Sequence, residues 1–507
     1  MISAVCWVPK GIAKPLPDSV EPPSQEEIQE LLKLPVESGS DDNESSEEDN
    51  NSEEENEGMV VETNKSKDAV AMALAAADAI GNKSVEFPRE LKVDEIADGL
   101  KELDMEHYDD DDDEGIDIFG NGSVGGFYCP SSDMGKYPSA VDDDEDEIED
   151  MTIKPSDQII ICARNEDEVS HLEIWVYEEQ TEEGGSNMYV HHDIILPAFP
   201  LALAWLDCNL KGGDKGNFVA VGTMQPEIEI WDLDVLDAVE PSIMLGGVVK
   251  CDTSRNIAKI KKKKKNKQAA TYKDGSHTNA VLGLAWNSEY RNVLASASAD
   301  KSVKIWDIVA EKCEHTMHPH TDKVQAVAWN SNQATVLLSG SFDRSIVMMD
   351  MRAPTHPGVR WLVPADVESL AWDPHTDHSF VVSLEDGTVR GFDIRVAVSA
   401  VDSEGKPMFT LHAHDKAVCT ITYNPAAPNL LATGSTDKMV KLWDMTNNQP
   451  TCIASTNPKV GAVFSACFSK DSPFLLGVGG SKGNLHVWDT LDNSEVSRRF
   501  GNFRPQN

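Results

Sequence analysis

The chain has 507 residues and a net charge of −43, from 87 Asp and Glu residues against 44 Lys and Arg residues. This length allows about three domains or one large repeat fold, and the acidic balance argues against direct wrapping of nucleic acid, which needs basic surface. No apolar run approaches the ~18 residues of a membrane span, no signal-peptide pattern opens the chain, and the nine Cys residues form no Cys-x-x-Cys pair, so we expect a reduced, intracellular protein without disulfides.

The first predicted element is a strand in the run SAVCWV at residues 3–8. Similar short apolar runs that end in an aromatic residue recur six times later in the chain, and each is typical of a β-strand. These later runs end at Trp205, Trp286, Trp329, Trp372, Tyr423 and Phe468. The likeness predicts that residues 1–10 supply the first strand of the same kind of unit.

The next segment is strongly acidic, because residues 1–150 hold 43 acidic and 10 basic residues. Such a composition buries too little apolar surface to offset chain entropy. We therefore expect residues 11–150 to be a largely disordered insertion that leaves the fold after Pro9 and returns near Met151. Short helices are predicted at 24–35, with Ser24 as a cap, and at 90–104; they are either transient or dock on a partner or the folded domain.

Four serines in this insertion have an acidic residue three positions further on, a pattern that resembles the site preferred by casein kinase 2. These candidate phosphorylation sites are Ser38, Ser45, Ser46 and Ser52. Phosphorylation would add negative charge to a segment that repulsion already extends. The acidic clusters could bind basic proteins such as histones or ribosomal proteins, or could only keep the chain soluble.

A repeat dominates the chain after residue 151. LASASADKSVKIWD (294–307) is echoed by LLSGSFDRSIVMMD (337–350) and LATGSTDKMVKLWD (431–444). The positions that match the repeat's closing Trp are Trp175, Trp231, Trp306, Met349, Phe392, Trp443 and Trp488. From each preceding aromatic the step to this position is 20 residues in five of six cases. Units of ~40–45 residues with four strands and a final Trp-Asp resemble WD repeats, so the fold class predicted is all-β, a seven-bladed propeller over residues 151–507.

Two units contain all four members of the hydrogen-bonded tetrad found in WD-repeat proteins. They are His277, Ser296, Asp300 and Trp306 in one unit, and His414, Thr433, Asp437 and Trp443 in another. A third unit has His320, Ser339 and Asp343, but Met349 replaces its Trp. Because the same spacing recurs, we interpret these residues as structural rather than catalytic.

A Lys-rich loop lies within residues 246–276, where two Trp positions are about 30 residues further apart than one blade requires. The basic residues are Lys259, Lys261, Lys262, Lys263, Lys264, Lys265 and Lys267. Such a run predicts a nuclear import signal read by an import receptor, with a weak RNA contact in addition. A solvated loop, or pairing with the acidic insertion, is the alternative.

No enzyme motif in the sequence lies in the structural context that its chemistry requires. GGSKG (479–483) matches a hydrolase nucleophile turn, but that turn joins a strand to a helix and this one lies in a predicted hairpin. The pairs His191–His192 and His318–His320 have no evident third metal ligand. We therefore predict no catalytic residues, metal, cofactor, small-molecule substrate or membrane contact.

Several blocks together resemble the periodic tryptophan protein 1 family. They include IKPSDQIIICAR (153–164), YVHHDIILPAFPL (189–201) and EIEIWDLDVLDAVEP (227–241), followed by the Lys-rich loop. The resemblance implies a nuclear, nucleolus-enriched, chromatin-associated scaffold that acts in ribosome production and in ribosomal-RNA transcription or processing. Its expected partners are pre-ribosomal, chromatin or histone-like basic proteins.

Two other functions stay open. Asp350 and Arg352, and Asp393 and Arg395, form Asp-x-Arg endings in consecutive units, which resemble the adaptor-binding box of cullin-4 ubiquitin-ligase substrate receptors. Both endings lack the Trp of that box, and an Arg that pairs a neighbouring Asp is the simpler interpretation. The acidic insertion alone would suit a chaperone of one basic ribosomal protein or histone.

Overall fold

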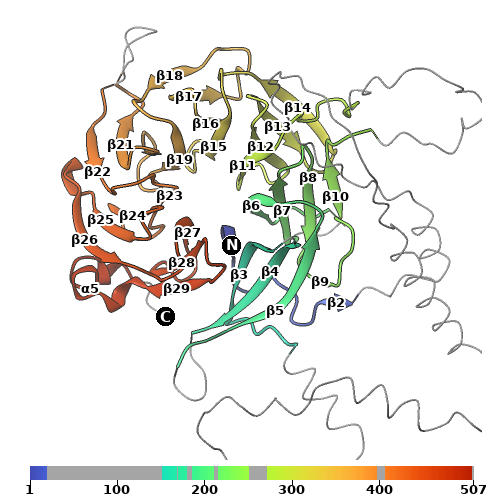
Figure 1. The fold of residues 1–507 in the computed structure, drawn as a ribbon, viewed down its shortest axis with the longest axis horizontal. Helices are drawn as coiled ribbons and strands as arrows, with labels where there is room; N and C mark the ends of the chain where they lie inside the picture. The colour runs from blue at the N-terminus through green and yellow to red at the C-terminus, as the bar shows by residue number, and fades with distance from the viewer. Residues whose placement is uncertain are drawn as a thin grey trace, which may run out of the picture. The chain divides into compact units, whose positions relative to one another are not determined.

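The structure is a computed structural model that describes residues 1–19, 151–167, 169–179, 185–210, 215–249, 271–396 and 406–504. Its strands form seven antiparallel sheets arranged as blades around a central axis, with the innermost strand of each blade facing that axis (Figure 1). The predicted seven-bladed β-propeller is confirmed. The helices predicted at 24–35 and 90–104, the candidate phosphorylation sites and the Lys-rich run 259–267 lie outside the described residues.

Blades two to six each have four strands, and their second strands are almost entirely buried. Blade two is built from β6 (Pro200–Leu206), β7 (Phe218–Thr223), β8 (Ile228–Asp232) and β10 (Ile243–Leu245). Blade three contains β11 (Val281–Trp286), β12 (Val293–Ser298), β13 (Val303–Asp307) and β14 (Lys312–Met317). Blade four contains β15 (Val324–Trp329), β16 (Val336–Ser341), β17 (Ser345–Asp350) and β18 (Val359–Leu362). Blade five contains β19 (Val367–Trp372), β20 (Ser379–Leu384), β21 (Thr388–Asp393) and β22 (Phe409–His412). Blade six contains β23 (Thr420–Tyr423), β24 (Leu430–Gly434), β25 (Val440–Asp444) and β26 (Thr451–Thr456). A short 3-10 helix, η2 (Thr446–Asn448), connects the last two strands of blade six.

Blade one combines the start of the chain with residues that follow the insertion. Strand β1 (Ile2–Val8) pairs antiparallel with β3 (Gln158–Glu166), with Val5 opposite Cys162. The blade continues outward through β4 (Val169–Glu178) and β5 (Asn187–Leu196). The run SAVCWV therefore occupies the inner position of blade one, about 150 residues before the strand that it pairs with.

The described chain stays on the propeller beyond Pro9, the exit point that the sequence suggests. Ile12 and Ala13 pack against the hydrophobic cluster of blades one and two. Strand β2 (Asp18–Ser19) then pairs in parallel with β9 (Val235–Leu236), and the Pro15 carbonyl accepts a hydrogen bond from the Ile153 amide. The residues before and after the insertion are thus joined directly.

Blade seven differs from the predicted four-stranded unit because it has three strands. These are β27 (Val463–Phe468), β28 (Leu475–Gly480) and β29 (His486–Asp489), and η3 (Thr490–Asp492), α5 (Ser494–Phe500) and η4 (Gly501–Phe503) follow. The Asn493 side chain caps α5 by accepting from the amides of Glu495 and Val496. Val496 and Phe500 are buried against blades six and seven, so a capped amphipathic helix replaces the expected fourth strand.

The ring closes where blade seven meets blade one. Ile2, Val5 and Trp7 of β1 form a buried cluster with Leu475 and Leu485 of blade seven. The Trp7 indole donates to the Cys467 carbonyl at 2.9 Å, and the Val5 amide donates to the Ser465 hydroxyl at 3.0 Å. Within the described residues no strand is exchanged between these two blades, so side-chain packing and hydrogen bonds hold the seam.

Candidate interaction surfaces

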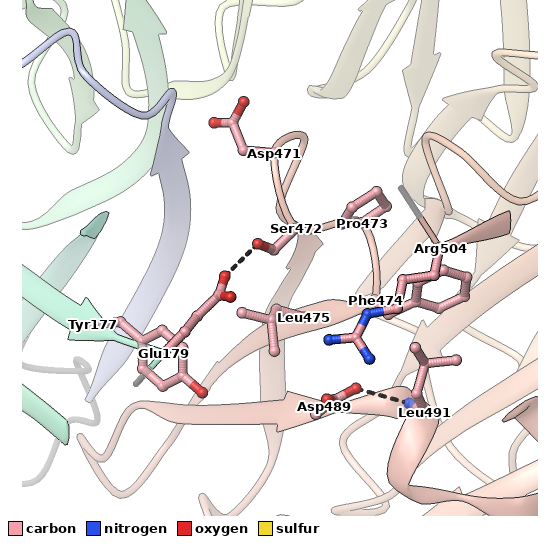
Figure 2. Close-up of a pocket in the computed structure, with 10 residues that line it drawn as sticks. All are labelled: Tyr177, Glu179, Asp471, Ser472, Pro473, Phe474, Leu475, Asp489, Leu491 and Arg504. Carbon is pink, nitrogen blue, oxygen red and sulfur yellow. Dashed lines mark hydrogen bonds between the residues drawn. The ribbon is translucent and has the colours of Figure 1, made fainter. Parts of the chain in front are cut away.

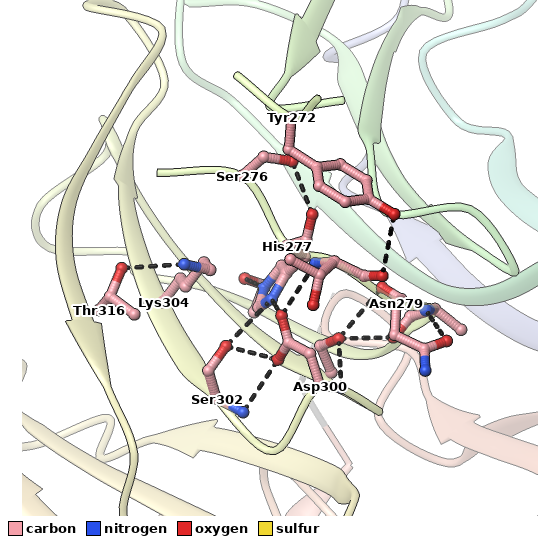
Figure 3. Close-up of polar contacts among 12 residues, drawn as sticks. Tyr272, Ser276, His277, Asn279, Asp300, Ser302, Lys304 and Thr316 are labelled. Carbon is pink, nitrogen blue, oxygen red and sulfur yellow. Dashed lines mark hydrogen bonds and ion pairs between the residues drawn. The ribbon is translucent and has the colours of Figure 1, made fainter. Parts of the chain in front are cut away.

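The tetrad of blade three is a single buried chain of hydrogen bonds. Ser296 Oγ accepts from the Trp306 indole at 2.8 Å and lies 2.7 Å from His277 Nε2. His277 Nδ1 lies 2.9 Å from Asp300 Oδ2, and the Ser302 hydroxyl donates to the same carboxylate (Figure 3). Because an ionised carboxylate only accepts, Nδ1 carries the proton and the Ser296 hydroxyl donates to Nε2. The chain joins the loop before the blade, the second strand, the hairpin turn and the third strand.

Blade six repeats this arrangement and blade four contains part of it. Thr433 Oγ1 accepts from the Trp443 indole at 2.9 Å and lies 2.8 Å from His414 Nε2, while His414 Nδ1 lies 2.8 Å from Asp437. In blade four, His320 contacts Ser339 at 2.8 Å and Asp343 at 3.1 Å. This chain of hydrogen bonds ends at Ser339, because the Met349 side chain has no hydrogen-bond donor.

The electrostatics of the tetrads suit a structural role. Burial would raise the pKa of Asp300, but hydrogen bonds from His277 and Ser302 hold that pKa well below its usual range. Burial also lowers the pKa of His277, and this outweighs the opposing effect of Asp300. The imidazole is therefore neutral beside an ionised Asp, and both groups are fully engaged within the blade.

The Trp residues of blades one and two use a different partner that the sequence analysis missed. The Trp231 indole donates to Glu229 Oε2 at 3.0 Å, and the Trp175 indole donates to Glu173 Oε2 at 2.9 Å. Glu229 is buried, which raises its pKa, although the bond from Trp231 opposes that effect. A Glu two residues before the Trp lies on the same face of the strand, so the pattern Glu-x-Trp was the available signal.

Buried Asn residues that link neighbouring blades were also missed. The side-chain amides of Asn287, Asn330 and Asn424 donate to the carbonyls of Ala334, Asp377 and Pro473 at 2.6–2.9 Å. Each Asn directly follows the aromatic residue of its inner strand, and each acceptor lies in the next blade. The recurring dipeptides Trp-Asn, Trp-Asn and Tyr-Asn were the signal in the sequence.

The two Asp-x-Arg endings each form a closed ion pair. Arg352 Nη2 lies 2.5 Å from Asp350 Oδ2, and Arg395 Nη2 lies 2.6 Å from Asp393 Oδ2. The Arg side chains are 72% and 65% exposed. They lie after the third strands of blades four and five, whereas the tetrad His and Asp residues lie at the opposite ends of the strands. Each Arg thus pairs the Asp of its own ending and presents its outer face to solvent.

The tetrad end of the propeller also carries exposed cations. Lys301, Arg344 and Lys438 occupy the same position in the hairpin turns of blades three, four and six, each with a positive φ of 61–74°. Blade five has Gly387 there. Further exposed lysines on loops of this end are Lys323, Lys416, Lys459 and Lys482. A side chain is strained in this conformation, so these three cations are held in the turns at a cost in stability. Exposed acidic residues lie on loops of the same end, among them Asp322, Glu385 and Asp415.

The remaining candidates from the sequence have structural surroundings. Ser481, Lys482 and Gly483 of the GGSKG motif form the turn between β28 and β29, so the motif joins two strands. A bulge in β5 brings His191 Nδ1 and His192 Nδ1 to 2.9 Å. Over the described ranges no group of three or more His, Cys, Asp or Glu residues could hold a metal ion. No helix in the same ranges is long and apolar enough to cross a membrane.

Comparison with known proteins agrees with this architecture. The WD domain, G-beta repeat family matches residues 267–307, 311–350, 405–444 and 450–489. The fold and the tetrads define a WD-repeat β-propeller, the class of protein to which this chain belongs.

Full-length relatives define the family more closely. The chain is 38% identical to an uncharacterised WD repeat-containing protein of Schizosaccharomyces pombe, over 99% of this chain and 91% of that protein. It is 30% identical to periodic tryptophan protein 1 of Saccharomyces cerevisiae, over 99% of this chain and 90% of the yeast protein. A periodic tryptophan protein 1 homolog of Drosophila melanogaster is 27% identical over similar shares. The chain belongs to the periodic tryptophan protein 1 family.

Proposed function

We propose that this protein is a non-catalytic scaffold of the nucleus and nucleolus that acts in ribosome production, in contact with pre-ribosomal particles and chromatin. The observation that carries the proposal is the relationship to periodic tryptophan protein 1 along 99% of the chain. WD-repeat propellers generally mediate contacts between proteins. The exposed cations at the tetrad end support contact with the phosphates of ribosomal RNA, and the acidic insertion supports contact with basic ribosomal proteins.

Affinity purification of the tagged full-length protein tests this proposal against its two rivals. We expect several pre-ribosomal proteins together with precursor ribosomal RNA, sedimenting as large particles in a sucrose gradient. Their recovery should fall between 50 and 300 mM salt, since exposed charges are screened over about 8 Å at physiological ionic strength. A single basic ribosomal protein or histone as the main partner would instead support a chaperone.

The second candidate function is that of a substrate receptor for a cullin-4 ubiquitin ligase. The exposed Arg352 and Arg395 in neighbouring blades favour it, because both guanidinium groups lie on the same end of the propeller. The double variant R352A/R395A should lose a ligase adaptor if this function holds. Because both Arg side chains lie on the surface, the melting temperature of the propeller should not change.

Nuclear import through the Lys-rich run is the second part of the proposal. We expect replacement of Lys261 to Lys265 by Ala to move the protein to the cytoplasm, because import receptors read such clusters through several Lys contacts. The melting temperature should not change, since no blade needs these residues. A matched control replaces five surface lysines at the tetrad end and should leave the protein in the nucleus. Nuclear accumulation of the five-Lys variant would refute the import role.

A further inference from the structure

Strand β29 of blade seven has an outer edge that no described strand pairs with. In the other blades a fourth strand covers the third strand: all five residues of β8 are buried, whereas all four residues of β29 are only half-buried. An uncovered strand edge presents backbone N–H and C=O groups that a further strand can bind. The edge of β29 is therefore a place where the blade can be completed.

The register between β28 and β29 identifies the free backbone groups. The Thr490 amide donates to the Phe474 carbonyl at 2.9 Å, and Trp488 lies opposite Leu476. In an antiparallel pair, alternate residues point their N–H and C=O groups to opposite sides. Residues 486, 488 and 490 thus bond to β28, so the backbone groups of Val487 and Asp489 point away from the blade.

Walls of side chains flank this edge on both sides. On one side, Val487 packs against the buried cluster that contains Leu485, and so do Trp175, Tyr177 and Met188 of blade one. On the other side, Trp488 packs against the cluster of blades six and seven that contains Val496 and Phe500 of α5. An added strand would thus find apolar contacts on each face, which is the arrangement that the inner strands of every blade have.

A cavity of about 180 Å³ lies at the end of the edge (Figure 2). Its charged lining residues are Glu179, Asp471, Asp489 and Arg504. Lys10 pairs with Glu179 at 3.2 Å, and Ser472 also donates to Glu179. Three carboxylates against Arg504 and the Lys10 ammonium leave one unmatched negative charge at the cavity. Asp489 contributes both a free backbone edge and a carboxylate.

We propose that the edge of β29 binds one extended segment of a partner protein as a fourth strand, with a Lys or Arg side chain of that segment in the cavity beside Asp489 and Glu179. The charge of the cavity selects a basic segment. The acidic insertion of this chain has the wrong sign, since residues 1–150 hold 43 acidic and 10 basic residues. The strand provides affinity through backbone hydrogen bonds, and the cavity provides specificity.

The direct test uses the full chain and a blocked nine-residue peptide of alternating Thr and Val with Lys at its centre. We expect binding in the range of tens of micromolar by fluorescence anisotropy, and at least tenfold slower hydrogen exchange of the Val487 amide on binding. A peptide with Glu in place of Lys should bind at least tenfold more weakly, and a peptide N-methylated at alternate residues should not bind. Equal binding of the Lys and Glu peptides would overturn the proposed cavity contact.

Substitutions distinguish a loss of peptide binding at the β29 edge from a loss of folding stability. Val487→Pro removes an N–H that points outward, so the variant should melt within a few degrees of the parent and lose at least tenfold in peptide affinity. Ile305→Pro is the matched control in blade three, where the N–H of Ile305 faces β14, and it should lower the melting temperature strongly. Asp489→Asn retains a side-chain acceptor for the Leu491 amide and should weaken only the Lys peptide.

Two results would contradict strand addition. One is unchanged peptide affinity in Val487→Pro. The other is a Val487 amide that already exchanges as slowly as the Ile305 amide in the free full-length protein, which would mean that a segment of this chain covers the edge. Neither result bears on the ribosomal role, because the purification described above does not depend on the β29 edge.

Discussion

At the scale of single residues, the tetrads turn polar side chains into stabilising contacts of the blade. Trp443→Phe removes the indole N–H that Thr433 accepts at 2.9 Å, and we expect a loss of about 1–3 kcal/mol in the free energy of unfolding. Urea denaturation measures this loss. Trp361→Phe is the matched control, because Trp361 is also buried but makes no side-chain hydrogen bond among the described residues. Equal losses in the two variants would show that ring volume, and not the hydrogen bond, matters.

A second residue-scale prediction concerns pH and His192. Burial, with His191 as a smaller cause, lowers the pKa of His192 from 6.5 to about 4. The unfolded chain therefore takes up a proton at His192 before the folded protein does. The stability contributed by the neutral ring is complete above pH 6.5 and is lost as the pH falls from 6.5 towards 4.

Unfolding measured at pH 7 and pH 5 checks this prediction. His192→Gln should remove about 1–2 kcal/mol of the difference in stability between these pH values. His318→Gln is the control, because His318 is exposed, and it should leave the difference unchanged. A pH dependence that His192→Gln does not reduce would contradict the assignment.

At the scale of elements, the hairpin turns between second and third strands depend on one residue with positive φ. Gly387 has a φ of +84°, and a Cβ there would lie 2.3 Å from the His414 carbonyl oxygen. We expect Gly387→Ala to cost about 2 kcal/mol or more, as substitutions at strained backbone positions do. Gly185→Ala is the control, because it has open space and no positive φ. Thermal melting distinguishes them, and a neutral Gly387→Ala would show that the turn relaxes.

In the corresponding turn of blade six, Lys438 occupies the position of Gly387, and we expect substitution there to have the opposite effect on stability. Lys438 has a φ of 74°, so Lys438→Gly should raise the free energy of unfolding by up to about 1 kcal/mol. If the exposed cations bind RNA phosphates, the same variant should bind RNA more weakly at low salt. A stabilised variant with unchanged RNA binding would limit the role of Lys438 to the turn.

Strand β1 makes the largest element-scale prediction. Deleting residues 1–10 exposes the inner edge of β3 and removes Ile2, Val5 and Trp7 from the seam. We expect a loss of several kcal/mol, with a melting transition lowered by more than 10 °C. Trp7→Leu, which retains the strand but loses the bond to Cys467, should lose less than the deletion. A truncated protein that melts like the full chain would show that β1 is dispensable.

Much of this fold is predictable from local patterns. SAVCWV has an aromatic residue near its end, as the later inner strands do, and in the structure Trp7, Trp329 and Trp372 all donate to a carbonyl of the neighbouring blade. The tetrads are predictable because their spacing recurs. The Glu229 and Asn287 contacts leave the signals Glu-x-Trp and Trp-Asn in the sequence, but the partner of each side chain depends on which strand faces become buried after the blades assemble.

The end of blade seven shows the limit of repeat-based reasoning. The Trp488-Asp489 pair marks a third strand, and the repeat then predicts a fourth. Residues 494–500 form a helix instead, capped by Asn493 and with Val496 and Phe500 on its buried face, and this local signal overrides the repeat. Similarly, the end of the run SAVCWV indicates that the insertion leaves the fold at Pro9, although Ile12 and Ala13 still pack on the propeller.

At the scale of the whole molecule, the propeller separates its structural polar groups from its exposed charges. The tetrads and the Asn bridges are internal, whereas the cations at the tetrad end, the two Asp-x-Arg endings and the β29 edge are accessible. This arrangement suits the scaffold function proposed above, since several modest contacts on different parts of one surface can sum to strong binding.

The measurement that tests the central claim most directly is the maturation of pulse-labelled ribosomal RNA after depletion of this protein. The proposed function predicts that precursor RNA accumulates and that mature RNA appears several-fold more slowly. The full-length protein should restore the normal rate, and the variant that lacks residues 1–10 should fail to do so. Normal maturation in depleted cells would contradict a role in ribosome production.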